Sequence, residues 1–498
     1  MKIIDNYEIS FENSKIPILI YEEEDGFVPI YEVGILKSGP YTKYIIEKIK
    51  QDLLREGIFE DTGEEINYVK LKELYIKKVR ELIKYYLPML DFELKEKLIT
   101  YVVQKSLDLG FVDILISDSG IEELTINGGD SFVMVYHRKH GWLKTNLTFL
   151  NDEEIKNIAS RIALENKKYF SNLNPLLDAH LRGGHRVNAT LGPISTKGTT
   201  ITIRRFSDKP WTVSDLITSK TSSALSLAII WVAMENELSV IVTGGTGSGK
   251  TSFLNSISSF IPADQRIISV EDTREIRLPD YAHWVPMESR QQNQEGRGGI
   301  SMLDLIVNSL RMRPDRIIIG EIRKKAEAEV LFEAMRTGHS VYGTFHANTA
   351  EETILRLSSP PIEIPKFTLS ALGLIVIQHR NRKSGRRVTL QIAEIDKKGD
   401  ENVILQYDAK EDKFKLKSKP IHLLEKLFEF QGITEKDFYF TLKERVLVLE
   451  YLAKFNITDI GAVGVVINQF YKDKKKLFKI IKDEFLVAKK KEIKYKKK

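Results

Sequence analysis

The sequence contains no cysteine among its 498 residues. Without cysteine the chain can form neither disulfide bonds nor thiolate metal sites, and this composition suits a reducing cytosol. The N-terminus runs directly into mixed polar sequence and carries no secretory signal pattern. The longest apolar runs, at residues 225–234 and 369–377, are too short to span a bilayer. We therefore expect a soluble protein that is able to dock onto a membrane protein.

The formal net charge of +6 is concentrated at one end of the chain. Residues 471–498 hold 13 lysines against four acidic residues, which leaves the first 470 residues at about −3. A slightly acidic body argues against a nucleic-acid groove across it. The basic tail is either a solvated, frayed terminus or a contact for anionic lipid headgroups or an acidic partner.

One glycine-rich stretch carries the strongest chemical signal. Residues 244–251 fit the phosphate-binding pattern G-x-x-x-x-G-K-[ST], between a predicted strand and a predicted helix. The glycines let backbone N–H groups turn toward a phosphate, and the helix N-terminus adds partial positive charge. We expect Lys250 to reach the β- and γ-phosphates and Thr251 to hold Mg²⁺. The predicted nucleotide-binding residues are Gly244, Gly245, Thr246, Gly247, Ser248, Gly249, Lys250, Thr251 and Ser252.

Three later apolar runs each predict a buried strand that ends in polar side chains. Helices predicted at about 301–312 and 325–337 separate the strands, and this alternation predicts a parallel sheet. Side chains at the carboxyl ends of such strands point into the ligand crevice, where an acid can hold Mg²⁺ or its water. The runs are 266–270, followed by Glu271 and Asp272, 316–319, followed by Glu321, and 341–345, followed by His346 and preceded by His339.

The flanking regions carry less chemistry. Helices predicted at about 69–86 and 91–109 make the first region either a docking adaptor or a structural cap. A hairpin, a helix and further strands follow it, and their arginines either neutralise transferring phosphate charge or form ordinary surface ion pairs. The candidate arginines are Arg186, Arg204 and Arg205. After residue 380, the sequence predicts strands at 387–395 and 403–407 and helices at 423–430, 443–455 and 457–485.

Four segments, taken in order, resemble the secretion ATPase superfamily, which comprises the type II secretion, type IV pilus and type IV secretion ATPases. Residues 136–142 and 186–188 resemble the archaeal branch that assembles pili and archaella. The four segments are 244–251, 270–275, 317–323 and 337–348, which are similar to that family's Walker A, Asp box, atypical Walker B and His box.

The resemblance implies an α/β protein with a RecA-like P-loop ATPase domain, preceded by an α+β PAS-like domain. A helical N-terminal extension and an α/β C-terminal region with a basic tail complete the expected organisation. The resemblance also implies a homo-hexameric ring with ATP bound between the two domains. The expected regions are 1–110 for the extension, 111–215 for the PAS-like domain, 216–380 for the ATPase core and 381–498 for the C-terminal region.

The resemblance further assigns roles to individual residues. Glu275 orients the attacking water, while Glu271 and Asp272 support the metal shell and Glu321 acts on Mg²⁺ through water. His339 and His346 sense the γ-phosphate or couple it to domain motion. The arginines that neutralise charge are Arg186, Arg204 and Arg205.

The expected function is that of an ATPase motor, which converts ATP and water to ADP and phosphate. It would assemble a type IV pilus-like filament, or drive type II-like secretion, by pushing a polytopic platform protein at the inner face of the cell membrane. No zinc and no nucleic acid are expected. Two alternatives remain: a DNA-transfer or nucleic-acid translocase ATPase on the same core, and a non-catalytic nucleotide-gated adaptor.

Overall fold

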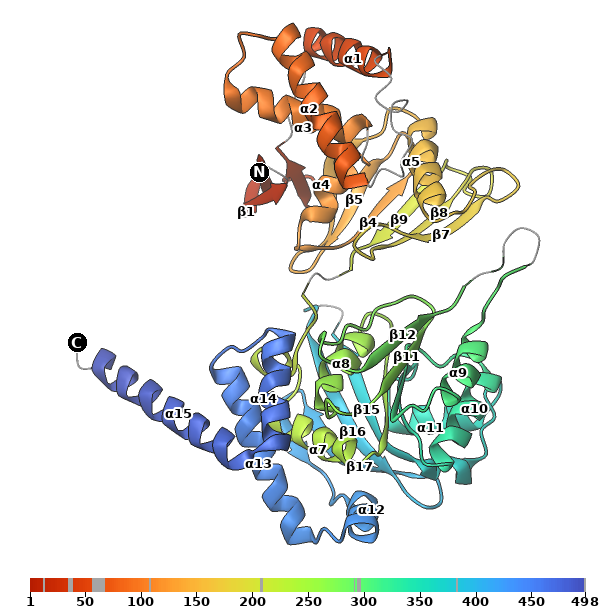
Figure 1. Ribbon diagram of the computed structural model, residues 1–498, viewed down its shortest axis with the longest axis vertical. Coiled ribbons are helices and arrows are strands. Elements are labelled where there is room, and N and C mark those ends of the chain that lie inside the picture. The colour runs from red at the N-terminus through yellow and green to blue at the C-terminus, as the bar shows by residue number, and fades with distance from the viewer. Residues whose placement is uncertain are drawn as a thin grey trace. The chain divides into compact units, whose positions relative to one another are not determined.

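The chain forms two compact units, Met1–Asp208 and Lys209–Lys498. The computed structural model describes residues 1–11, 14–34, 39–55, 68–106, 109–206, 209–290, 292, 297–381 and 384–496. Within this part, each unit holds a nine-stranded sheet and its own hydrophobic core (Figure 1). The predicted α/β class is confirmed.

The sheet of the first unit has the strand order β1-β2-β3-β6-β5-β4-β9-β8-β7. Its neighbours are antiparallel except β3 and β6, where Ile30 pairs in parallel with Lys144. The predicted hairpin is present as β4 and β5. The strands are β1 (Lys2–Phe11), β2 (Ser14–Glu22), β3 (Ile30–Val33), β4 (Ile121–Asn127), β5 (Phe132–His137), β6 (Gly141–Thr148), β7 (Leu176–His180), β8 (Arg186–Thr190) and β9 (Thr200–Arg204).

The sheet continues across residue 110, where the sequence led us to expect the first region to end. Strands β1 to β3 come from that region, and they join the sheet through the pairing of β3 with β6. This pairing links residues more than 100 positions apart, so local sequence patterns carry no sign of it. The helices α1 (Pro40–Arg55), α2 (Tyr68–Tyr86) and α3 (Phe92–Ser106) form a separate core, in which Ile49, Val79 and Val102 are buried.

A buried carboxylate fastens the added strands to the rest of the first unit. Asp118 follows α4 (Phe111–Ser117), and its Oδ2 atom accepts hydrogen bonds of 2.6 Å from the hydroxyls of Tyr7 in β1 and Tyr31 in β3. The Oδ1 atom accepts a third bond, of 2.7 Å, from the backbone N–H of Gly120. Burial and the neighbouring carboxylate raise the pKa of both tyrosines, so the hydroxyls stay protonated donors.

The sheet of the second unit has the order β12-β11-β13-β14-β10-β15-β16-β17-β18. The strands from β12 to β15 are parallel, and the remaining neighbours are antiparallel. The strands are β10 (Ser239–Gly244), β11 (Ile267–Glu271), β12 (Trp284–Glu288), β13 (Arg316–Ile319), β14 (Ser340–Phe345), β15 (Leu372–Arg380), β16 (Arg387–Ile395), β17 (Glu401–Asp408) and β18 (Lys413–Leu416).

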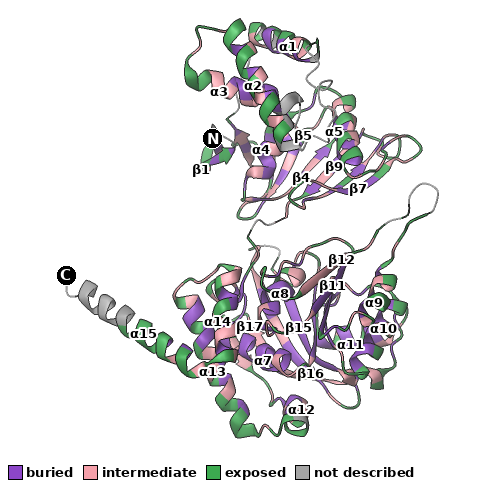
Figure 2. Cartoon of the chain, viewed as in Figure 1, coloured by how far each residue is buried: buried purple, intermediate pink, exposed green. Residues whose placement is uncertain are grey.

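Helices cover both faces of this second sheet, so its central strands are buried on both sides (Figure 2). In β10, Val240 and Val242 pack on one face, whereas Ile241 packs on the other. Every residue of β10 is buried, as expected for a strand inside a parallel sheet. One face packs against α7 (Ala224–Glu235), α8 (Lys250–Ile257), α13 (Glu435–Lys454) and α14 (Ile460–Lys472), and the other against α9 (Met302–Leu310), α10 (Lys325–Arg336) and α11 (Ala350–Ser358).

The sheet also continues across residue 380, because β16 pairs with β15 and is followed by β17 and β18. The predicted single helix at 457–485 is two helices, α14 and α15 (Lys474–Lys496), which separate at Asp473. The side chains of residues 487–498, including the basic end of the tail, lie outside the described part. Among the described residues, no helix combines the length and apolar character needed to cross a membrane.

Candidate nucleotide site

The glycine-rich loop links the carboxyl end of β10 to the first turn of α8, as predicted. Gly247 (φ 72°) and Gly249 (φ 89°) have left-handed backbones that residues with side chains rarely adopt. A Cβ atom at Gly244 would lie 2.2 Å from the backbone oxygen of Gln378 in β15. The loop therefore depends on glycine for its turn and for its close approach to a neighbouring strand.

Two buried oxygen atoms at the carboxyl ends of the parallel strands have no hydrogen-bond partner among the described residues. They are the Oγ atom of Ser248, within the loop, and the Oε2 atom of Glu271, at the end of β11. Buried polar atoms without partners are costly in a finished structure. Their location at the carboxyl edge of the parallel strands is where a bound polar ligand or its metal would supply the missing contacts.

Lys250 folds back over its own loop. Its Nζ atom donates to the backbone oxygens of Gly244 (3.1 Å) and Gly245 (3.3 Å), and lies 3.4 Å from Nδ1 of His346. Phosphate oxygens can replace such backbone oxygens as acceptors. The lysine is thus held at the mouth of the loop, where an entering phosphate would meet it.

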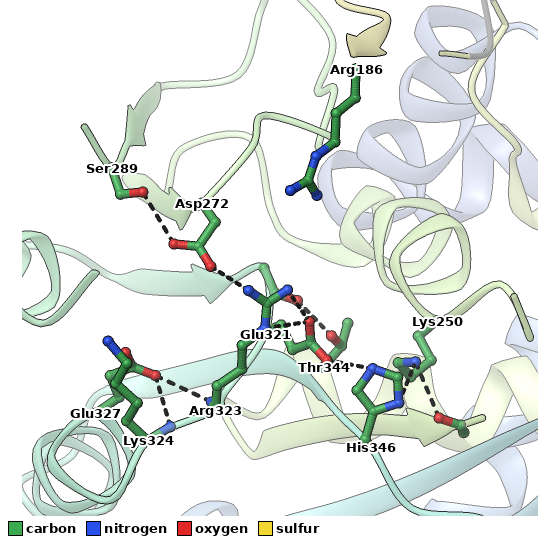
Figure 3. A network of polar contacts seen from close by, with 12 residues as sticks. Arg186, Lys250, Asp272, Ser289, Glu321, Arg323, Lys324, Glu327, Thr344 and His346 are labelled. Atoms are coloured by element: carbon green, nitrogen blue, oxygen red, sulfur yellow. Dashed lines mark hydrogen bonds and ion pairs between the residues drawn. The ribbon is translucent and has the colours of Figure 1, made fainter. Parts of the chain in front are cut away.

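A chain of charged side chains crosses the ends of three adjacent strands (Figure 3). Oε1 of Glu321 lies 2.6 Å from Nε2 of His346, and Oε2 of Glu321 accepts from Arg323 at 2.5 and 2.8 Å. Arg323 also contacts Oδ2 of Asp272 at 2.7 Å, and Ser289 donates to the Oδ1 atom of that aspartate. The residues that follow β11, β13 and β14 therefore form one connected network beside Lys250.

Glu271 shapes the segment that carries Glu275. Its Oε1 atom accepts from the backbone N–H groups of Glu275 (2.9 Å) and Ile276 (3.0 Å). Asn255 of α8 accepts from the backbone N–H of Arg277 at 2.8 Å, which ties the same segment to the helix after the loop. Burial raises the pKa of Glu271 to about 7, although the two backbone hydrogen bonds oppose this shift.

His346 keeps an uncharged imidazole near neutral pH. Burial and the positive charge of Lys250 lower its pKa, and the carboxylate of Glu321 only partly opposes them. A neutral imidazole can accept a hydrogen bond on one nitrogen and donate a hydrogen bond from the other. His346 therefore contacts Lys250 and Glu321 through its two different ring nitrogens.

His339 is not brought to this network. It precedes β14, whereas His346 follows it, so the two histidines lie at opposite edges of the sheet, about 20 Å apart along the strand. The Nδ1 atom of His339 instead lies 3.3 Å from the hydroxyl of Thr337 and from the backbone oxygen of Ala334. Within one chain, His339 and the glycine loop therefore do not form a common site.

The three candidate arginines lie in the first unit. Arg186 of β8 and Arg204 of β9 are register partners, and Arg186 pairs with Asp178 at 3.2 Å. Arg205 donates from Nε to the backbone oxygen of Ile116 at 2.6 Å. Arg205 thus connects β9 to α4, while Arg186 and Arg204 place two cations side by side on the sheet.

Three residues without a predicted role hold this site together, namely Arg323, Asn255 and Ser289. The position of Arg323, two residues after Glu321, was a usable signal, because a cation beside a strand-end acid tends to pair with it. Nothing in the local sequence around Asn255 or Ser289 indicates their contacts, which join elements that are distant along the chain.

Comparison with known proteins identifies the family of this chain. Residues 105–409 match the family described as type II/IV secretion system proteins. An uncharacterized protein of Methanocaldococcus jannaschii is 35% identical over 350 residues, which is 68% of this chain and 46% of that protein, so the chain spans less than half of that relative.

Two further comparisons concern a relative and a solved structure. A putative conjugal transfer protein of Mycobacterium tuberculosis is 30% identical over 257 residues, covering 50% of this chain and 72% of that protein. The X-ray structure of the Legionella pneumophila ATPase DotB is 21% identical with a TM-score of 0.43, covering 72% of this chain and 95% of that one. Since the family match covers more than half of the sequence and includes the glycine loop and its acidic network, this chain belongs to the type II/IV secretion system protein family.

Proposed function

We propose that this chain hydrolyses ATP as the motor of a secretion or filament-assembly machine. The observation that carries the proposal is the connected series Lys250, His346 and Glu321, set at the carboxyl edge of the parallel strands. The series joins the residue that meets a phosphate to an acid that can act on the metal. An arrangement of this kind suits coupling of nucleotide state to movement more than simple nucleotide storage.

The residues of this site have two roles: they position the reacting groups, and they neutralise negative charge. The backbone N–H groups of the loop and the Lys250 ammonium group hold the phosphates, because glycine allows the required turn. Glu275 orients the attacking water, and Glu271 sets the position of Glu275 through its backbone. Phosphoryl transfer needs little covalent participation from the protein, so this positioning accounts for most of the expected rate.

The donor atoms at this edge fit Mg²⁺, which prefers oxygen ligands. Thr251 in the first turn of α8 and the carboxylate of Glu321 are oxygen donors beside the loop, and the carboxylate of Asp272 is joined to Glu321 through Arg323. When bound, Mg²⁺ would neutralise charge that develops on the transferred phosphoryl group. Glu321 is held for this contact by Arg323 on one side and His346 on the other.

The larger assembly is part of the same proposal. We infer a homo-hexamer in which Arg186, Arg204 and Arg205 neutralise phosphate charge, with His339 as a further coupling residue outside the cluster of a single subunit. The ring would act on a polytopic platform protein at the inner face of the membrane and assemble a pilus-like filament or drive secretion. The family description supports the secretion class without naming the cargo.

Two measurements on the full chain, one with purified protein and one with native membranes, test the motor. Mass photometry with and without ATP and Mg²⁺ should reveal a nucleotide-dependent hexamer, and affinity isolation of the tagged protein from its native membranes should recover a polytopic membrane protein. A strictly monomeric protein that hydrolyses ATP and co-purifies with no membrane protein would reject the motor and leave a simple ATPase.

A DNA-transfer ATPase is the second candidate, because one relative is named a putative conjugal transfer protein. In that case, double-stranded or single-stranded DNA should stimulate ATP hydrolysis, and the stimulation should fall steeply as salt rises. The net charge of about −3 over the first 470 residues argues against such binding. ATP hydrolysis that stays unchanged by DNA at low salt would remove this candidate.

A further inference from the structure

Two arginines lie beside the glycine loop, on the side opposite the acidic network. Strand β10 has β14 on one side and β15 on the other. The β14 side carries His346 and the Glu321 network. On the β15 side, Arg380 ends β15 and Arg387 begins β16, and the two are directly paired in the antiparallel ladder.

Both arginines touch the loop itself. Nε of Arg387 donates to the backbone oxygen of Gly247 at 3.0 Å. A Cβ atom at Gly247 would lie 3.0 Å from Nη1 of Arg380, and one at Gly249 would lie 3.3 Å from Cδ of Arg387. The guanidinium groups therefore occupy the space over the two left-handed glycines of the loop.

A guanidinium fork matches phosphate oxygens well, both in geometry and in charge. The arginine pair thus suits the anionic part of a nucleotide, while the acidic side of the loop suits the metal. On this division, the arginines would contact the phosphates nearer the nucleoside. The γ-phosphate would lie on the side of the loop that carries His346 and Glu321.

We propose that Arg380 and Arg387 form a second cationic contact for the nucleotide, supplied by the same subunit as the glycine loop. They bind the α- and β-phosphates, which ATP and ADP share. On binding, Arg387 exchanges the Gly247 backbone oxygen for a phosphate oxygen. This inference rests on the proposed function of the loop as a nucleotide site, and it adds two residues to that site.

Isothermal titration of the full chain with ADP, without Mg²⁺, tests the pair. Arg380→Ala and Arg387→Ala should each weaken ADP binding about tenfold, the loss expected for one charge-assisted hydrogen bond, and should weaken ATP binding by the same factor. Arg386→Ala is the matched control, because Arg386 is the neighbouring residue and pairs with Asp412 at 2.6 Å. That variant should bind ADP as the wild type does.

Salt dependence separates phosphate contact from mere support of the loop. Removing a cation that touches phosphate should flatten the fall of ADP affinity with rising salt, because fewer charges are then screened. Loss of loop support alone would leave that slope as it is in the wild type. An unchanged slope in both alanine variants would overturn the proposal even if their affinity falls.

The remaining outcomes are equally decisive. If both alanine variants bind ADP with wild-type affinity, or if only their affinity for ATP falls, the arginine contact is overturned. The glycine loop remains the nucleotide site in either case. If the wild-type chain binds no ADP, the proposed function fails and this contact fails with it. Should Arg387→Ala not fold, as judged by circular dichroism, then Arg380→Gln and Arg387→Lys decide, and unchanged ADP affinity in both would overturn the proposal.

Discussion

Nε2 of His346 lies 2.6 Å from Oε1 of Glu321, while Nδ1 of the same ring lies 3.4 Å from Nζ of Lys250. One imidazole therefore stands between the lysine of the glycine loop and the acid at the end of β13. A phosphate that draws Lys250 away from the loop oxygens also changes the partner of the ring, and the ring in turn contacts Glu321. This geometry gives the site a route from phosphate binding to the metal-side acid.

Replacing His346 with alanine should impair hydrolysis more than binding. Loss of the ring breaks the contact between Lys250 and Glu321, yet it leaves the loop and its backbone N–H groups intact. We expect the rate of ATP hydrolysis to fall about tenfold or more, as for loss of one positioned polar group, with ADP affinity within about twofold. His422→Ala is the control, because His422 contacts Glu425 in α12. Equal losses in binding and turnover would contradict this role.

The Glu275→Gln variant should bind ATP but hardly cleave it. Glutamine keeps the size of the side chain but cannot accept a proton from water, so single-turnover cleavage should slow by about 100-fold or more. Rapid-quench measurement at saturating ATP gives that rate directly. Glu351→Gln, on the exposed first turn of α11, should cleave ATP normally. A Glu275→Gln enzyme with the wild-type single-turnover rate would reject the water-orienting role.

Glu271 should make the stability of the chain depend on pH in a predictable direction. Burial raises its pKa to about 7, so the folded chain holds this proton more tightly than the unfolded chain does. Its contribution to stability is therefore fully present below about pH 4.5 and is lost as the pH rises to 7. Glutamine stays neutral at every pH. The free energy of unfolding of Glu271→Gln should therefore rise by on the order of 3 kcal/mol relative to that of the wild type across that range.

Thermal unfolding of the nucleotide-free protein from pH 4.5 to 8 measures this difference between Glu271→Gln and the wild type. The gain should level off above about pH 7, where the wild-type carboxyl group is ionised in both states. A constant difference in melting temperature across the range would contradict the buried, proton-retaining carboxyl group.

Asp118→Ala should loosen the N-terminal strands without affecting the nucleotide site. The change leaves the hydroxyls of Tyr7 and Tyr31 without their shared acceptor, at a cost of about 2 kcal/mol or more. Hydrogen exchange followed by mass spectrometry should become faster in peptides of β1 and β3 and stay unchanged in β10. Asp130→Ala, at the exposed turn between β4 and β5, is the control. Unchanged exchange in β1 would show that Asp118 does not secure that strand.

Local sequence patterns predicted the elements well where each element shows its own periodicity. The strand before Gly244, the strands that end near Glu271 and Glu321, and helix α10 are all present. Parallel pairing then brings their carboxyl ends to one edge, as the alternation of strands and helices indicated. The contact of Glu321 with the rest of the site follows from that pairing.

Features that depend on distant pairing were not visible in the sequence. Strands β1 to β3 read as parts of a separate region because their partner β6 is far along the chain. The arginines beside the loop, Arg380 and Arg387, are brought there by the pairing of β15 with β10. His339 sits in the same short motif as His346, and only the direction of β14 places the two histidines at opposite edges.

The most direct test of the account is release of phosphate from ATP and Mg²⁺ by the purified full chain. The wild type should turn over ATP continuously, whereas Lys250→Ala should show no turnover above background and no ADP binding. Lys325→Ala, which removes an exposed lysine that pairs with Glu363, should hydrolyse ATP like the wild type. Wild-type hydrolysis by Lys250→Ala would contradict the central claim that this glycine loop binds and presents the nucleotide.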